Sequence, residues 1–80
     1  MYYYVRGLGK KLKREREQWG MSRRRLAKLC HVEVEDILDI ETGKNKTPSF
    51  SLILDICEVL DISAFTFLTD FGQENFNDIL

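Results

Sequence analysis

The sequence contains few of the residues that build metal centres, disulfide frameworks or catalytic triads. Only two cysteines and one histidine occur among 80 residues. Cys30 and Cys57 lack Cys-x-x-Cys spacing, which argues against a zinc site or a redox dithiol. His31 is the one available imidazole, so a Ser-His-Asp arrangement is not indicated. We therefore expect no metal, no cofactor and no enzymatic activity.

Long hydrophobic runs are also missing. Stretches such as Leu52-Ile53-Leu54 are far shorter than the roughly 20 apolar residues that a membrane-spanning helix needs. Residues 1–5 lack the basic-then-apolar layout of a signal peptide. We expect a soluble, cytoplasmic protein with no membrane partner. Its length predicts a single domain over residues 1–80 with a thin core, for which dimerisation is a natural supplement.

The net charge of −1 conceals a strong asymmetry along the chain. Ten Lys and Arg residues but only two acidic residues lie between Met1 and His31. From Val32 onward the chain carries two lysines and eleven acidic residues. A basic half favours a polyanionic partner such as nucleic acid, whereas an acidic half favours a basic protein surface or self-association.

Strand-forming patterns are scarce, because only residues 2–5 are rich in β-formers and the single proline and the glycines fall between helical patterns. Apolar residues recur at helical spacing, and serines and glycines stand where helices begin and end. We predict an all-α fold of five short helices. They cover Arg6 to Trp19, Ser22 to Cys30, Val34 to a stop at Thr42-Gly43, a segment beginning at Pro48-Ser49, and a segment capped by Ser63.

The predicted core includes both cysteines as buried, reduced thiols on apolar stripes. The aromatic residues Trp19, Phe65, Phe67 and Phe71 are also expected in the core. Apolar residues of the last helix and of the tail 72–80 exceed what one small core needs. We expect them to contribute to a dimer seam.

Two short helices joined by a tight turn, preceded by one helix and followed by two, are typical of a helix-turn-helix DNA reader. A specific set of residues spans about residues 8 to 71. It consists of Leu8-Gly9, Leu12, Arg16, Gly20-Met21-Ser22, Leu26-Ala27, Val32, Ile37, Ile40-Glu41, Gly43, Pro48-Ser49, Leu52, Leu60, Ile62-Ser63 and Leu68. In these residues the chain resembles the phage repressor and Cro type family, often called XRE. The resemblance implies a repressor-like helix-turn-helix domain of bacterial or phage origin.

The resemblance implies three groups of DNA contacts. The start of the second helix is expected at a backbone phosphate and the third helix in the major groove, and the exposed polar loop after it is also expected to contact DNA. The residues concerned are Ser22, Arg23 and Arg24; Glu33, Val34, Glu35, Asp36 and Asp39; and Lys44, Asn45 and Lys46. A plain helix cap with solvated arginines is the alternative for the first group. The lysines of the first helix are expected on a solvated face.

Three positions depart from the family pattern. His31 replaces a glycine in the turn, where a positive φ is expected at some cost. Glu15 stands at a position that is normally apolar. Four carboxylates, Glu33, Glu35, Asp36 and Asp39, replace the usual polar and basic residues of the reading helix.

The acidic third helix leaves several interpretations open. A carboxylate can accept from cytosine N4, whereas several carboxylates beside phosphates repel. The acids can instead complement the dipole of their own helix or pair with the basic second helix. A further alternative is that the helix imitates the charge of DNA and binds a basic partner protein.

Arg16 and Glu41 occupy family positions that form a partly buried ion pair, which would fix the angle of the third helix. Taken together, the sequence predicts a DNA-binding transcriptional regulator, repressor-like, that binds double-stranded DNA as a homodimer in the bacterial nucleoid. The alternative function is a protein-interaction module or antirepressor of the same fold.

Overall fold

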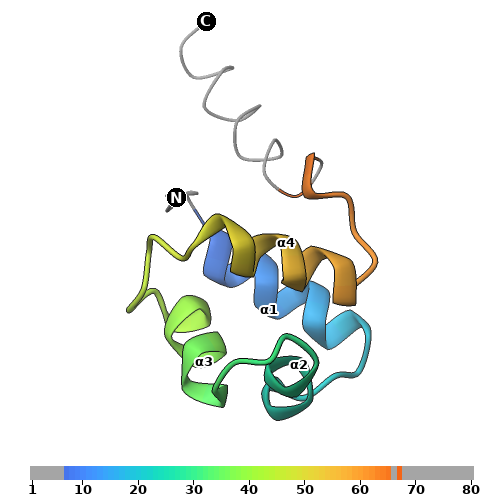
Figure 1. Ribbon diagram of the computed structural model, residues 1–80, viewed down its shortest axis with the longest axis horizontal. Helices are drawn as coiled ribbons and strands as arrows, with labels where there is room; N and C mark the ends of the chain where they lie inside the picture. Colours follow the sequence, from blue (N-terminus) through green and yellow to red (C-terminus); the bar gives the residue numbers. More distant parts are fainter. Residues whose placement is uncertain (1–6, 66, 68–80) are drawn as a thin grey trace, which may run out of the picture.

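The computed structural model describes residues 7–65 and Phe67, and these form an all-helical fold (Figure 1). No β-strand occurs among these residues. None of the helices in this part of the chain is long and apolar enough to cross a bilayer. The helices are α1 (Leu8–Gln18), α2 (Arg23–Leu29), α3 (Val34–Thr42) and α4 (Phe50–Val59).

Residues 7–65 and Phe67 contain four of the five helices that the sequence predicts as complete elements. Ala64, Phe65 and Phe67 are helical, and the Phe67 amide donates to the Ser63 carbonyl at 2.8 Å. The rest of the predicted fifth helix, with Phe71 and the tail 72–80, lies outside the described residues.

Serines and glycines set the helix ends, as the sequence predicts. Ser22 Oγ accepts from the Arg25 amide at 3.0 Å and Ser49 Oγ from the Leu52 amide at 3.2 Å, so both serines cap helices. Gly43 ends α3 in the left-handed region with φ 83°. The prediction that the first helix begins at Arg6 is wrong, because Gly7 is also left-handed, with φ 73°, and α1 begins after it.

The core lies between the four helices and receives side chains from each of them. Burying these aliphatic groups supplies the main driving force for folding a chain of this size. Both cysteines are buried there, as predicted. The core residues are Leu8, Leu12, Leu26, Ala27, Cys30, Ile37, Ile40, Ile53, Ile56, Cys57, Leu60 and Phe67.

Two of the aromatic residues predicted in the core are on the surface. Trp19 is 55% exposed and Phe65 76% exposed, whereas Phe67 is buried. Trp19 lies just beyond the end of α1, and its indole N–H donates to the Leu60 carbonyl at 2.8 Å. An indole N–H that is buried without an acceptor costs free energy. The hydrogen bond to Leu60 supplies the acceptor and keeps the Trp19 ring at the edge of the core.

The prediction that every lysine of the first helix is solvated is wrong for Lys11. Its side chain is buried, and its ammonium lies 5.5 Å from the centre of the Phe67 ring. Burial, with a smaller contribution from Arg14, lowers the pKa of Lys11. A cation over an aromatic face offsets part of this desolvation. The long methylene chain of Lys11 therefore closes the core beside Phe67.

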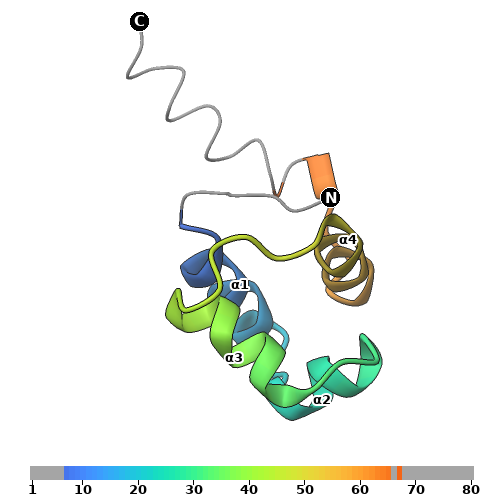
Figure 2. The ribbon, with the colours of Figure 1, turned by 60° about the vertical axis from the view of Figure 1, so that its left-hand side comes forward.

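The views in Figures 1 and 2 agree that α2 and α3 lie together on one side of the molecule, with α4 on the other. Helix α3 packs on both α1 and α2. The contact with α1 is close at Gly9, where an added Cβ would overlap the carbonyl oxygens of Ile40 and Glu41. The absence of a side chain at Gly9 thus sets how near α3 lies to α1.

Candidate nucleic-acid interface

A tight turn joins α2 to α3. The Val32 amide donates to the Ala27 carbonyl at 3.0 Å, and the Val32 side chain packs against the core. His31 adopts the left-handed conformation with φ 59°, as its position in the turn predicts. This turn fixes α3 against α2 and leaves one face of α3 outward.

The outward face of α3 combines aliphatic and acidic side chains. Val34 and Leu38 are 39% and 38% exposed, and Glu35 is exposed between them in sequence. Ile37 and Ile40 are buried on the opposite side. Val34 and Leu38 are four residues apart, and this spacing places both on one face of α3.

The four acidic residues of this region do not have one common role. Asp36 Oδ2 accepts from the Glu33 amide at 2.9 Å, so Asp36 caps α3. Glu33, Glu35 and Asp36 all lie near the N-terminus of α3, where the helix dipole favours negative charge. Asp39 is half-buried. Glu35 is therefore the exposed acid of α3 that takes no part in the cap.

Glu41 on α3 links this helix to α1 and α2. Its side chain is 1% exposed, and it accepts from Arg16 Nε at 2.6 Å, Arg16 Nη2 at 3.0 Å and Arg23 Nε at 2.7 Å. Arg16 Nη1 also donates to the Met21 carbonyl at 2.7 Å. The network joins α1, the α1–α2 turn, the start of α2 and the end of α3.

The network also decides the ionisation of its members. Burial raises the pKa of Glu41, but the hydrogen bonds and charges of Arg16 and Arg23 outweigh it, and the net pKa is lowered. The hydrogen bond to Glu41 raises the pKa of Arg16. Both groups are thus charged and paired, which is the arrangement that makes a buried charge tolerable.

The residues expected at a phosphate occupy the start of α2. Ser22 Oγ is engaged in the cap, and Arg23 Nε is engaged with Glu41, although the Arg23 side chain remains 37% exposed. Arg24 is exposed. Arg25 and Lys28 on the same helix are exposed as well, and sequence reasoning did not include them among the contacts.

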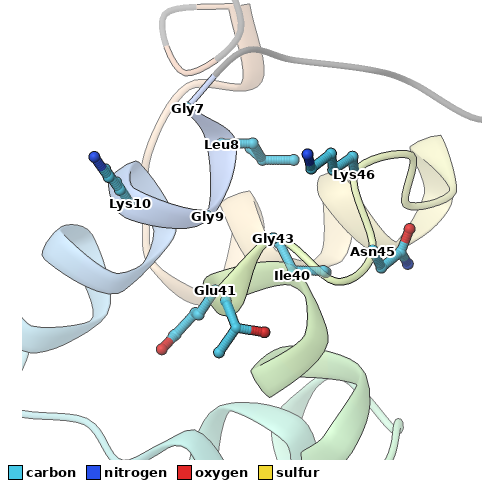
Figure 3. Close-up of a pocket in the computed structure, with 10 residues that line it drawn as sticks. Gly7, Leu8, Gly9, Lys10, Ile40, Glu41, Gly43, Asn45 and Lys46 are labelled. Atoms are coloured by element: carbon cyan, nitrogen blue, oxygen red, sulfur yellow. The ribbon is translucent and has the colours of Figure 1, made fainter.

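The loop between α3 and α4 carries Lys44 and Lys46, both exposed. Asn45 shapes the loop through two hydrogen bonds. Its side-chain Oδ1 accepts from the backbone amide of Thr47 at 3.0 Å, and its backbone amide donates to the Asp39 carbonyl at 2.9 Å. Figure 3 shows a shallow depression beside this loop, between the start of α1 and the end of α3, with Lys46 extending toward Leu8. It lies where Gly9 allows the two backbones to approach.

The two cysteines are poorly suited to catalysis or metal binding. Burial, with a smaller contribution from Asp55, raises the pKa of Cys30 to about 11, and burial also raises the pKa of Cys57. Thiols of this kind are poor nucleophiles and poor metal ligands at neutral pH. Within residues 7–65 and Phe67, no group of three or more His, Cys, Asp or Glu side chains is placed to hold a metal ion.

Comparisons with known proteins agree with this architecture. The model of the helix-turn-helix domain family matches residues 8–64. The N-terminal DNA-binding domain of SinR from Bacillus subtilis is 29% identical with a TM-score of 0.73, and the match covers 78% of this chain and 90% of that one. A structure of SinR in complex with DNA is 30% identical with a TM-score of 0.72, over 76% and 97% of the two chains.

A more distant structure is the clp gene regulator ClgR from Corynebacterium glutamicum. It is 25% identical with a TM-score of 0.73, and the match covers 85% of this chain and 87% of that one. No curated protein sequence matches the chain. Since the family model spans well over half of the 80 residues and the α2–turn–α3 unit is in place, the chain belongs to the helix-turn-helix domain family and has a fold of the Cro/repressor type.

Proposed function

We propose that this protein is a sequence-specific DNA-binding transcriptional regulator of the repressor type, which places α3 in the major groove of double-stranded DNA. The observation that carries the proposal is the α2–turn–α3 unit, with one face of α3 exposed. The similarity to SinR and ClgR supports it. In this docking mode α2 crosses the backbone while the start of α3 meets base edges.

The charges around α3 are compatible with this docking. Asp36 is engaged in the helix cap and Glu41 is neutralised by two arginines. Exposed cations occur on the two segments that adjoin α3 along the chain. They are Arg24, Arg25 and Lys28 on α2, and Lys44 and Lys46 in the loop after α3. Such cations neutralise phosphates and offset the repulsion from Glu35.

Arg23 and Arg24 have different roles in this proposal. Arg23 is held by Glu41 through Nε, so its main contribution is to position the start of α2 against the end of α3. Arg24 is exposed and free to follow a phosphate through its flexible side chain. Ser22 supports both arginines by capping α2.

The proposal is tested by selection on random DNA followed by gel shifts between low and physiological salt. We expect Arg24→Gln to weaken binding to all sequences alike and to reduce the log-log salt slope by about one unit for one lost phosphate contact. Arg23→Gln should lower folding stability more and the slope less. Binding that is undetectable for the wild-type protein, even at low salt, would rule out the DNA-binding function.

A second function is favoured by one observation. The exposed Val34 and Leu38 lie with Glu35 on a face that contains no Lys or Arg side chain between residues 32 and 43. Apolar side chains with carboxylates suit a basic protein surface, as an antirepressor would use. In that case Glu35→Gln would slow association with the basic partner most strongly at low salt, and no DNA would be retained.

We also propose that the regulator acts as a homodimer in the bacterial cytoplasm, whether the chain derives from a bacterium or a phage. A two-fold dimer matches the symmetry of paired operator half-sites. The exposed Phe65, at the end of the described segment, supports an apolar seam in this region. Sedimentation equilibrium of the wild-type protein and of Phe65→Ser tests it, since only the wild-type protein should dimerise at micromolar concentration.

A further inference from the structure

The outward face of α3 carries hydrogen-bond acceptors but no donor side chain that is free for a base. Val34 and Leu38 are aliphatic, and Glu35 only accepts when ionised. The only hydroxyl on α3 belongs to Thr42, and its Oγ1 donates to the Leu38 carbonyl at 2.9 Å. The chemistry of this face is thus apolar and acceptor-only.

The edges of the bases differ in what they offer to such a face. Guanine presents two acceptors in the major groove, N7 and O6, and its usual protein partners are the donors of Arg or Lys. Adenine and cytosine present amino groups that donate, and thymine presents a methyl group. A carboxylate is therefore attracted to adenine N6 or cytosine N4 and repelled by guanine, while an aliphatic side chain prefers a thymine methyl.

We propose that α3 reads its operator through thymine methyl groups, which contact Val34 and Leu38, and through the amino group of adenine or cytosine, which donates to Glu35, without direct readout of guanine. This inference rests on the proposed DNA-binding function and specifies the bases that it recognises. Residues four apart on a helix lie about 5 to 6 Å from each other. Val34 and Leu38 can therefore reach adjacent base pairs, which are stacked about 3.4 Å apart.

An A·T pair satisfies both kinds of contact at once. Its thymine offers the methyl group and its adenine offers the N6 amino group on the same groove edge. Glu35 lies beside Val34 in sequence, so one A·T pair can serve both side chains. The cations of α2 and of the loop after α3 then hold the backbone and carry no sequence information.

The first test replaces each thymine of a selected duplex by uracil, which removes only the methyl group. Losing one buried methyl group corresponds to about a fourfold loss of affinity. We expect this loss at one or two thymines for the wild-type protein. In Val34→Ala or Leu38→Ala the loss should disappear at one thymine each. Leu54→Ala is the matched control, because Leu54 is 41% exposed but lies on α4.

The second test replaces each guanine of the same duplex by 7-deazaguanine, which removes the N7 acceptor. We expect affinity to stay within about twofold, since no side chain of α3 donates to that atom. Glu35→Gln should add a donor, raise affinity and shift selection toward adenine, because an amide can both donate and accept.

The outcomes separate this inference from the function on which it rests. DNA binding that tolerates uracil everywhere but is weakened by 7-deazaguanine would overturn the base-reading assignment and leave the DNA-binding function intact. No retention of any duplex at low salt would overturn both and favour docking on a basic protein. Circular dichroism of each variant checks that it is folded.

Discussion

At the scale of the residue, the Glu41 carboxylate organises the charged interior of the domain. It is almost fully buried and holds two arginines that are distant in sequence, Arg16 and Arg23. A buried ion pair contributes little net stability compared with an apolar replacement of both partners, but removing one partner is costly. Its contribution here is to fix the end of α3 relative to α1 and α2.

The removal of Arg16 tests this role. Arg16→Met should lower the free energy of unfolding by about 3 kcal/mol, the low end for breaking a buried pair, because Arg23 still faces Glu41. The double variant Arg16→Met with Glu41→Met should recover much of the loss. Arg14→Met, on the exposed side of α1, is the control. The free energies of unfolding in urea are compared for Arg16→Met, Glu41→Met and the double variant. If the losses of the two single variants add up to the loss of the double variant, the residues are not coupled.

Glu41 also predicts how acid affects the fold. Its pKa in the folded state is lowered, so its contribution is present above the pKa of the unfolded chain, about 4.3 for a glutamate, and is lost as the pH falls through the folded-state value. We expect the unfolding free energy of the wild-type protein to fall more steeply below about pH 4 than that of Glu41→Gln. Parallel curves for the two proteins would argue against an ionised Glu41 in the fold.

At the scale of the element, the contact between α1 and α3 depends on Gly9. Alanine is normally preferred to glycine in a helix by about 1 kcal/mol. A methyl group at Gly9 would overlap the main chain at the end of α3. We expect Gly9→Ala to lower stability by about 1 to 3 kcal/mol, as overpacking does. Lys13→Ala, at an exposed position of α1, should be neutral. A thermal midpoint that rises in Gly9→Ala would contradict the close approach.

The helices were predictable from the sequence because single residues determine where they begin and end. Ser22 and Ser49 cap helices and Gly43 ends one, and each of these roles follows from the chemistry of a single residue. The burial of Lys11 and the exposure of Trp19 were not predictable in this way. Both side chains are long and have an apolar body with a polar end, so only the packed structure decides which part is covered.

Part of the charged network around Glu41 was predictable from the sequence. The family pattern placed Arg16 beside Glu41, and the structure brings them into contact. It gave no indication that Arg23 also pairs with Glu41, because that contact depends on the angle between α2 and α3. The sequence left several roles open for the acidic residues of α3. The hydrogen bond from the Glu33 amide shows that Asp36 caps the helix, and no such bond assigns a cap role to Glu35.

At the scale of the whole molecule, basic and acidic segments lie side by side within the described residues 7–65. The basic α2 packs on the acidic α3, so charges of opposite sign are neighbours in the fold. The proposed DNA interface therefore has cations around an acidic and aliphatic centre. Such an arrangement obtains affinity from the rim and selectivity from the centre.

The most direct test is a chemical-shift map of the full-length, ¹⁵N-labelled protein titrated with a selected duplex at low salt. The proposed interface predicts amide shifts concentrated in residues 22–25, 33–39 and 44–46, with the amides of α4 nearly unchanged. Shifts confined to α4, or no shifts at saturating DNA, would contradict the assignment of α2, α3 and their loop as a DNA-reading surface.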